Sequence, residues 1–263
     1  MSTTQRLKES IVKNPARYAY SRHKHYQQYG LTPTETKHLD GLATLETNGI
    51  VVFENYFSPE QVEKMRGEVK PLMDDLIADK YTGKEATHRF PEYGVYRLLE
   101  LDNAAPSTKL FFDDEKINSL ARAFVSPKVT SYQRMAESKP QPDTKSIADD
   151  WHFDDWKHRL KAFLYLSDVG PNEAPFVYVE GTHHFHWWRF LKEWEYYAHP
   201  KDKRKGYFDN DEFEAIQKEH TYNVRTCTAK AGTVILADTR GLHRGSLLKQ
   251  NSRLMLVNFF DVR

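Results

Sequence analysis

Apolar residues are spaced differently in the two halves of this chain. In the first half they recur at helical intervals: Leu39, Leu42 and Leu45 would share one face of a helix. Asn48-Gly49 then supplies a helix C-cap, and the β-branched run at 50–53 follows it. This pattern predicts a short helix that leads into a strand.

Two longer helices are predicted further along. Ser58-Pro59-Glu60-Gln61 places a hydroxyl at the N-cap, proline at the first helical position and glutamine at the third, ahead of an apolar stripe that ends at Leu76. A kink is expected at Pro71. Asp113-Asp114 puts acids at the positive N-terminal end of a second amphipathic helix, which reaches Phe124.

After Ser126-Pro127 the pattern changes to short strand-like runs separated by Gly, Pro and Asn. The predicted strands cover 128–137, 159–167, 175–180, 221–227, 232–237 and 252–260. Many short strands favour a sandwich or barrel that encloses a small ligand over a flat sheet. We therefore expect a mainly β fold with flanking helices, of the α+β class.

The chain length suits one domain with appended helices. Residues 1–38 are polar and basic, and we expect a helical extension that packs on a single domain at 39–263. Two aromatic-rich insertions, at 184–199 and 207–220, are expected to form a helical lid over about 184–220. The basic run at 201–205 is interpreted as a solvated loop.

Composition excludes several function classes. The 38 Lys and Arg nearly cancel the 37 Asp and Glu, so net charge recruits neither nucleic acid nor an anionic membrane. No apolar run approaches the roughly 18 residues of a membrane span, and the N-terminus lacks an apolar signal region. A single cysteine, Cys227, cannot close an intramolecular disulfide and is expected to be a small buried hydrophobe. We expect a cytoplasmic protein whose function lies among its 12 histidines.

His152 and Asp154 are two positions apart, which in an extended chain directs both side chains to one side. A second pair of this kind, His38-Leu39-Asp40, is interpreted as a chance occurrence. His243 comes 91 residues after His152, in a turn between predicted strands. Two histidines and one aspartate can form a facial triad, which leaves three positions open on octahedral iron(II) for a bidentate co-substrate and dioxygen. Arg253, at the start of the last predicted strand, can bind a carboxylate near such a metal.

Four blocks of the sequence resemble the phytanoyl-CoA dioxygenase (PhyH)-like family of Fe(II)/2-oxoglutarate-dependent oxygenases. The block from Glu46 to Leu76 is similar to the family's opening strand and helix start, and Lys161–Val169 to its next strand. Ala174–His183 resembles its Gly-Pro…Pro-Gly-Ser-His block, and the segment from Gly232 to Phe260 matches best. Together the blocks span most of the chain.

The resemblance implies a double-stranded β-helix core of the jelly-roll, cupin-like type, and a non-haem dioxygenase that uses Fe(II), 2-oxoglutarate and O2. The implied iron ligands are His152, Asp154 and His243, and Arg253 would bind the distal carboxylate of 2-oxoglutarate. Three further residues are candidates for holding the co-substrate, namely Lys161, Tyr165 and Lys139.

Departures from the family pattern bear on the substrate. Glu-Gly-Thr-His at 180–183 replaces Pro-Gly-Ser-His, and Phe153 stands where phytanoyl-CoA hydroxylases often carry glutamine, so a CoA ester is not implied. The acid at 154 argues against the halogenating relatives, which carry a small residue there. We expect oxidation of an unactivated C–H of a small organic substrate, with release of succinate and CO2. Hydroxylation is the default outcome, and desaturation or ring closure stay open.

The histidines at 183, 184 and 186, followed by Trp187 and Trp188, suggest either a second metal site or lid aromatics that pack or touch substrate. The run at 183–188 itself contains no carboxylate, which favours the lid, although His183 alone could face the pocket.

Two other classes of protein compete with the oxygenase. One is a metal-binding sensor or interaction protein on the same fold without turnover, which would not need Arg253 as a co-substrate anchor. The other is a zinc hydrolase on the same three ligands, although the chain has no His-Glu-x-x-His helix. No oligomeric state follows from the sequence.

Overall fold

The computed structural model describes residues 39–90, 94–140, 147–154, 157–198 and 207–262, with four positions before them, Ala16, Ala19, Tyr20 and His23. The rest of the predicted N-terminal extension at 1–38 lies outside the described residues, as does the basic run at 201–205.

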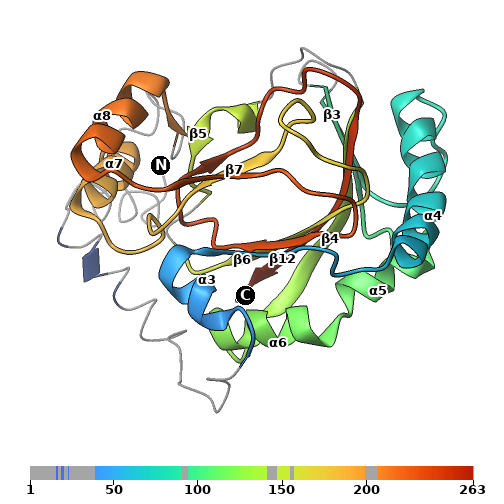
Figure 1. Cartoon of the computed structure of the whole chain (residues 1–263), viewed down its shortest axis with the longest axis horizontal. Coiled ribbons are helices and arrows are strands. Elements are labelled where there is room, and N and C mark those ends of the chain that lie inside the picture. The colour runs from blue at the N-terminus through green and yellow to red at the C-terminus, as the bar shows by residue number, and fades with distance from the viewer. Residues whose placement is uncertain are drawn as a thin grey trace, which may run out of the picture.

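Two antiparallel sheets face each other (Figure 1). The larger has the strand order β1-β10-β6-β12-β4-β3-β2, and the smaller has the order β8-β5-β11-β7-β9. The strands are β1 Ile50–Phe53, β2 Thr87–Phe90, β3 Val95–Leu99, β4 Thr130–Lys139, β5 Trp151–His152, β6 Leu160–Tyr165, β7 Phe176–Val179, β8 Tyr207–Phe208, β9 Val224–Cys227, β10 Val234–Ala237, β11 His243–Arg244 and β12 Arg253–Asp261. The expected double-stranded β-helix core with flanking helices is confirmed.

The helices gather in two places. Those of the first half, α3 to α6, cover the outer face of the larger sheet, and α7 and α8 lie beside the smaller one (Figure 1). They are α3 Leu42–Asn48, α4 Pro59–Ile77, α5 Lys109–Phe112, α6 Glu115–Phe124, α7 Trp187–Ala198 and α8 Asn210–His220. Two short 3-10 turns, Pro106–Thr108 and Ile147–Asp149, complete the elements.

The predicted caps Gly49, Ser58 and Asp114 are confirmed, although the first helix begins at Leu42 and leaves Leu39 outside it. Ser58 accepts a hydrogen bond from the Gln61 N–H, and the Gln61 side chain accepts one from the Ser58 N–H, so both partners of the capping box are present. Gly49 ends α3 with φ 78°, a left-handed conformation that favours glycine. Helix α4 continues through Pro71 as one element.

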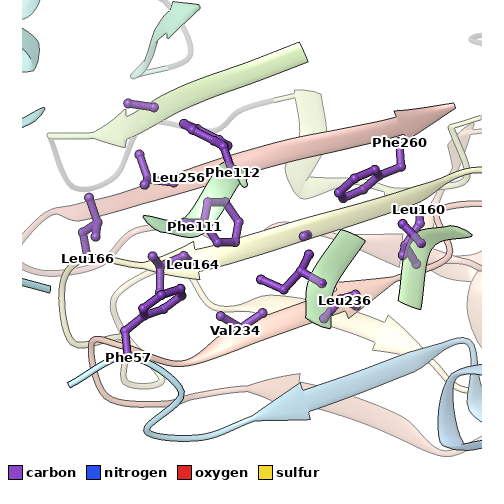
Figure 2. Packing of buried hydrophobic residues seen from close by; sticks show 14 of the residues in the cluster. Phe57, Phe111, Phe112, Leu160, Leu164, Leu166, Val234, Leu236, Leu256 and Phe260 are labelled. Atoms are coloured by element: carbon purple, nitrogen blue, oxygen red, sulfur yellow. The ribbon is translucent and has the colours of Figure 1, made fainter. Parts of the chain in front are cut away.

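Alternation along the strands of the larger sheet separates two apolar layers. On β6, Leu160, Ala162 and Leu164 face the helices, whereas Phe163 and Tyr165 face the smaller sheet. Figure 2 shows the helix side, where aromatic rings of α5 lie against leucines of the sheet. Both faces are covered, and the helix side is the thicker hydrophobic core. Polar side chains line part of the space between the two sheets.

We predict that Leu256→Ala destabilises the fold by about 3 kcal/mol. Leu256 is fully buried on β12, against Leu164 and Ala136 of the neighbouring strands, so truncation removes apolar contacts and leaves a cavity. The matched control is Leu191→Ala, because Leu191 on α7 is 54% exposed and should change the free energy of unfolding by less than about 0.5 kcal/mol. Urea denaturation of both variants measures the difference. A loss below about 1 kcal/mol for Leu256→Ala would contradict a tightly packed helix side.

Candidate functional site

Strands β5 and β11 bring the two predicted metal-ligating histidines together. His152 and His243 are direct partners across the antiparallel pair, and their ring centroids are 4.3 Å apart. The backbone N–H of Asp154 donates to the Thr239 carbonyl at 3.0 Å, which places its carboxylate beside both rings. Asp154 Oδ1 lies 3.9 Å from His152 Nε2 and 3.8 Å from His243 Nε2. Within the described part of the chain, these three residues form the one group with metal-ligand spacing.

Both imidazoles present the same nitrogen to the centre. The Nδ1 atoms of His152 and His243 lie 2.8 Å from the carbonyl oxygens of Asp150 and Gly241. A carbonyl oxygen only accepts, so each Nδ1 carries the hydrogen and each Nε2 keeps its lone pair for a cation. Burial lowers the pKa of both rings, that of His243 to about 3. The two imidazoles are therefore neutral near pH 7, as metal ligands must be.

The carboxylate of Asp154 is ionised in this environment. Burial opposes its ionisation, but Lys161, whose Nζ lies 2.6 Å from Oδ2, and the two histidines outweigh burial and hold its pKa well below the ordinary value. Lys161 reaches this position from β6 and also lies over the ring of Phe259, 4.6 Å from its centroid. The structure thus brings the predicted residue Lys161 to the triad.

A tight turn before β11 fixes His243. The Asp238 carboxylate is fully buried and receives hydrogen bonds from Arg240, both from its backbone N–H and from its guanidinium. The Tyr178 hydroxyl donates to the Asp238 carbonyl at 2.9 Å. A Cβ at Gly241 would meet the Tyr178 hydroxyl oxygen at 1.9 Å, so only glycine fits there. Packing therefore requires a glycine in the turn that precedes the predicted metal ligand His243.

A cavity opens between the two sheets and reaches the triad. Its apolar walls come from both sheets, and its polar lining lies in two places: at the triad with Lys161, and at the paired ends of β4 and β12. It is lined by Val95, Arg97, Met135, Glu137, Lys139, Ala148, Asp149, His152, Lys161, Phe163, Phe176, His243, Gly245, Arg253, Met255, Val257 and Phe259.

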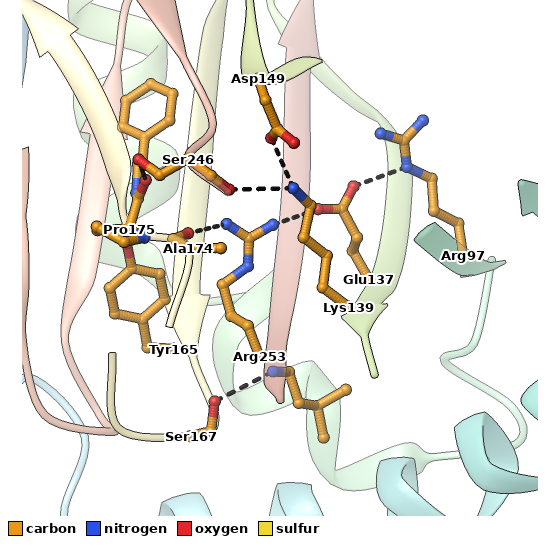
Figure 3. Close-up of polar contacts among 12 residues, drawn as sticks. Arg97, Glu137, Lys139, Asp149, Tyr165, Ser167, Ala174, Pro175, Ser246 and Arg253 are labelled. Atoms are coloured by element: carbon orange, nitrogen blue, oxygen red, sulfur yellow. Dashed lines mark hydrogen bonds and ion pairs between the residues drawn. The ribbon is translucent and has the colours of Figure 1, made fainter. Parts of the chain in front are cut away.

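Arg253 lies inside this cavity and is held from two sides. Its Nη1 donates to the Ala174 carbonyl, and its Nη2 donates to Glu137 Oε1 at 2.8 Å. Glu137 also accepts a hydrogen bond from Arg97 Nε at 2.7 Å, so one buried carboxylate lies between two guanidinium groups (Figure 3). Burial opposes ionisation of Glu137, but Arg97 and Arg253 outweigh it and lower its pKa to about 2.

Lys139 occupies the same end of the cavity. Its Nζ donates to Asp149 Oδ1 at 2.6 Å and to the Ser246 carbonyl at 3.3 Å (Figure 3). Gly245 allows this close approach, because a Cβ there would meet Asp149 Oδ1 at 2.6 Å. The Lys139 ammonium is thus paired within the protein.

Tyr165 is not brought to the cavity. It is fully buried between the sheets, its hydroxyl donates to the Cys227 carbonyl at 3.0 Å, and the same oxygen accepts the Phe176 N–H at 3.3 Å. Tyr165 is thus not among the residues that line the cavity, and two backbone groups occupy its hydroxyl. Cys227 is buried, as expected, and burial raises the pKa of its thiol to about 12.

The histidines at the start of the first insertion make structural hydrogen bonds. His183 Nε2 lies 3.0 Å from the Glu46 carbonyl oxygen, and His184 Nε2 lies 3.3 Å from that of Thr47, so both tie this turn to α3. His186 Nδ1 accepts from the Tyr222 hydroxyl at 3.1 Å. His183 does not line the cavity that reaches the triad.

The sequence reasoning missed three charged residues of this site, Arg97, Glu137 and Asp149. Glu137 had a usable signal, because it lies two positions from Lys139 at the end of a predicted strand and therefore shares its face. Asp149 lies in a segment for which no element had been predicted.

The chain is similar to known proteins in sequence and in structure. The family model described as phytanoyl-CoA dioxygenase (PhyH) matches residues 45–247. The ectoine dioxygenase of Sphingopyxis alaskensis is 22% identical over 212 residues, which are 76% of this chain and 68% of that protein.

Solved structures share the fold. The structure of EctD from S. alaskensis with 2-oxoglutarate and 5-hydroxyectoine has a TM-score of 0.66 and 17% identity, covering 89% of this chain and 80% of that one. The non-heme alpha ketoglutarate dependent epimerase SnoN from nogalamycin biosynthesis has a TM-score of 0.61 and 12% identity, covering 83% and 80%. The family model covers most of the described domain, which confirms the resemblance expected from the sequence. The chain belongs to the phytanoyl-CoA dioxygenase (PhyH) family.

Proposed function

We propose that this chain oxidises an unactivated C–H bond of a small organic substrate at the cavity between its sheets, with His152, Asp154 and His243 as the iron ligands and Arg253 as the main co-substrate anchor. The chain is an Fe(II)- and 2-oxoglutarate-dependent dioxygenase, the class to which its family belongs. The observation that carries the site assignment is the convergence of two neutral imidazoles and one carboxylate at the wall of a cavity whose interior holds Arg253.

The three ligand residues fit a divalent iron ion. Their ligand atoms all lie within 4.8 Å of one another, and two neutral nitrogens with one carboxylate oxygen are the donor set of a facial triad with open positions. Backbone carbonyls orient both imidazoles, so little reorganisation is needed on binding. Bound iron would supply the oxidising chemistry with O2 and the keto acid, and release succinate and CO2.

The buried end of the cavity fits the distal carboxylate of 2-oxoglutarate. Arg253 is 5% exposed at its side chain, and its Nε is buried without a hydrogen-bond partner among the described residues. A buried N–H of this kind is costly unless a ligand satisfies it, and a planar guanidinium matches a carboxylate. Lys161, beside Asp154, is proposed to contact the co-substrate at the metal end. Lys139 supports the Arg253 end through its pairing with Asp149.

The protein groups around the metal would orient the substrate and exclude water. Phe163, Phe176 and Val257 provide apolar walls, which suit a substrate C–H and keep water from the reactive centre. Hydroxylation stays the proposed outcome. No helix in the described part of the chain is long and apolar enough to span a membrane. We propose a cytoplasmic location, because the buried Cys227 thiol is the chain's single cysteine.

We predict that metal binding depends on the triad. Under anaerobic conditions, wild-type protein should bind Fe(II) and then develop a visible charge-transfer band with 2-oxoglutarate. Asp154→Ala should weaken Fe(II) binding at least about 10-fold, because one ligand and its charge are lost. Asp40→Ala is the matched control, since Asp40 is an exposed carboxylate paired with Lys116 and belongs to the other His-x-Asp pair. Fe(II) bound without any 2-oxoglutarate band would instead favour the sensor or hydrolase.

We predict that Arg253→Gln separates co-substrate binding from metal binding. The affinity for 2-oxoglutarate should fall about 10- to 100-fold, because charge-assisted hydrogen bonds to its distal carboxylate are lost. Fe(II) affinity, measured in the same titration, should stay within a few-fold of wild type. Arg122→Gln, at an exposed arginine on α6, is the control and should change neither affinity. Equal 2-oxoglutarate affinity in Arg253→Gln would refute the proposed anchor.

We predict a pH-dependent role of Glu137 in stability. Its pKa is lowered from 4.5 to about 2 in the folded chain, so its contribution is complete above pH 4.5 and is lost as the pH falls towards 2. Glu137→Gln should therefore be less stable than wild type at pH 7, and the difference should shrink by up to about 3 kcal/mol on acidification. Urea denaturation at pH 7, 5, 4 and 3 measures it. A difference that stays constant below pH 4.5 would show that the carboxylate is not held by the two arginines.

A further inference from the structure

Arg97 differs from the other cations of the cavity in its position. It comes from β3 and lines the same cavity as Arg253, but its side chain is 30% exposed, against 5% for Arg253 and 4% for Lys139. It therefore lies on the more exposed side of the Arg253 end of the cavity, with Glu137 between the two guanidinium groups.

The guanidinium of Arg97 is held in place by one hydrogen bond, and its other N–H groups are available for a ligand. Its Nε donates to Glu137 Oε2, and the register of β3 and β4 pairs the two residues directly, so the side chain is oriented from its base (Figure 3). Among the residues that the structure describes, neither terminal amino group of Arg97 has a hydrogen-bond partner. Those two groups form the edge that binds a carboxylate in a bidentate manner.

The charges of the site leave one cation in excess. Four cations surround the cavity and the triad against three carboxylates: Arg97, Lys139, Lys161 and Arg253 against Glu137, Asp149 and Asp154. The pairs Lys139–Asp149 and Lys161–Asp154 account for two of each, and two arginines share Glu137. A divalent iron ion and a doubly charged co-substrate cancel each other. The loaded site therefore keeps one net positive charge, which favours an anionic group on the substrate.

We propose that Arg97 supplies the binding site for a carboxylate of the substrate, and that this chain acts on small organic acids. The inference rests on the proposed function. A cationic substrate group is disfavoured, because Glu137, 8% exposed at its side chain, already binds an arginine at each oxygen. The apolar side chains of Val95 and Met135, which line the cavity with Arg97, would contact the hydrocarbon part of such an acid.

The test compares acids with their neutral amides. Protein loaded with Fe(II) and saturated with 2-oxoglutarate under anaerobic conditions is titrated calorimetrically with hexanoate and benzoate, and then with hexanamide and benzamide. Saturation with 2-oxoglutarate keeps the acids from Arg253. At least one acid should bind, and its amide should bind 10-fold or more weakly. Succinate formation in air, with and without each acid, gives a second readout.

Variants assign the effect to one residue. Arg97→Gln should weaken binding of the acid about 10- to 100-fold and leave the amide unchanged, since only the charge-assisted pair is lost. Arg97→Lys keeps the charge without the planar guanidinium, so its affinity for the acid should lie between those of wild type and Arg97→Gln. Retained binding of 2-oxoglutarate shows that each variant is folded. Arg122→Gln, at the exposed arginine of α6, is the matched control.

Several results would overturn the inference. They are equal affinity for acid and amide, unchanged affinity for the acid in Arg97→Gln, or no binding of any acid. Preferential binding of inorganic phosphate, added as a further titrant, would replace a carboxylate by a phosphate as the recognised group. Failure of the first step, the binding of Fe(II) and 2-oxoglutarate, would contradict the proposed function itself and is seen before any acid is added.

Discussion

The site depends on one cross-strand pair. His152 on β5 and His243 on β11 are direct antiparallel partners, so residues far apart in the sequence present their rings to the same point. Both strands are only two residues long, and the pair is fixed by what surrounds it: backbone carbonyls on each Nδ1, the Asp238–Arg240 turn before β11, and Tyr207 stacked on His152 from β8. The ligand geometry is thus a property of the small sheet and its turns.

The larger sheet supplies charge opposite this pair. Lysines and arginines point inward from β3, β4, β6 and β12 in a space that is largely closed to water, where an unpaired ion is costly. Each is paired with a carboxylate, and Glu137 serves two arginines at once. These pairs keep Arg253 extended and oriented before any ligand arrives. Removing one member of a pair would leave its partner as a buried, uncompensated charge. The ion pairs therefore fix the positions of the side chains around Arg253, as packing does elsewhere.

Much of the fold and of the candidate site was predictable from the sequence, and the predictions that failed have physical reasons. Caps, apolar periodicity and β-branched runs located helices α3, α4 and α6 and the strands β1, β4, β6, β7, β9, β10 and β12, because those signals are local. Strands β5 and β11 are too short to show a period, and β2 and β3 carry charged residues at an edge. Alternation along β6 predicted correctly that Tyr165 faces the space between the sheets. Alternation does not predict how far along the strand the cavity extends, and the cavity lining does not include Tyr165. Arg97 and Glu137 escaped because their pairing depends on the register of β3 against β4.

The division between recognisable and unrecognisable parts of the site bears on specificity. The proposed iron ligand His243, the proposed anchor Arg253 and Lys161 lie in the blocks that carried the resemblance, whereas β3 and β4 lie between those blocks, within the range that the family model matches. Neighbours with this fold include an ectoine dioxygenase and an epimerase, so the shared core does not decide which bond reacts. That choice depends on where a substrate C–H is held relative to the metal. In this chain β3 and β4 contribute Val95, Arg97, Met135, Glu137 and Lys139 to the lining of the cavity, so the proposed substrate position depends on side chains of these two strands.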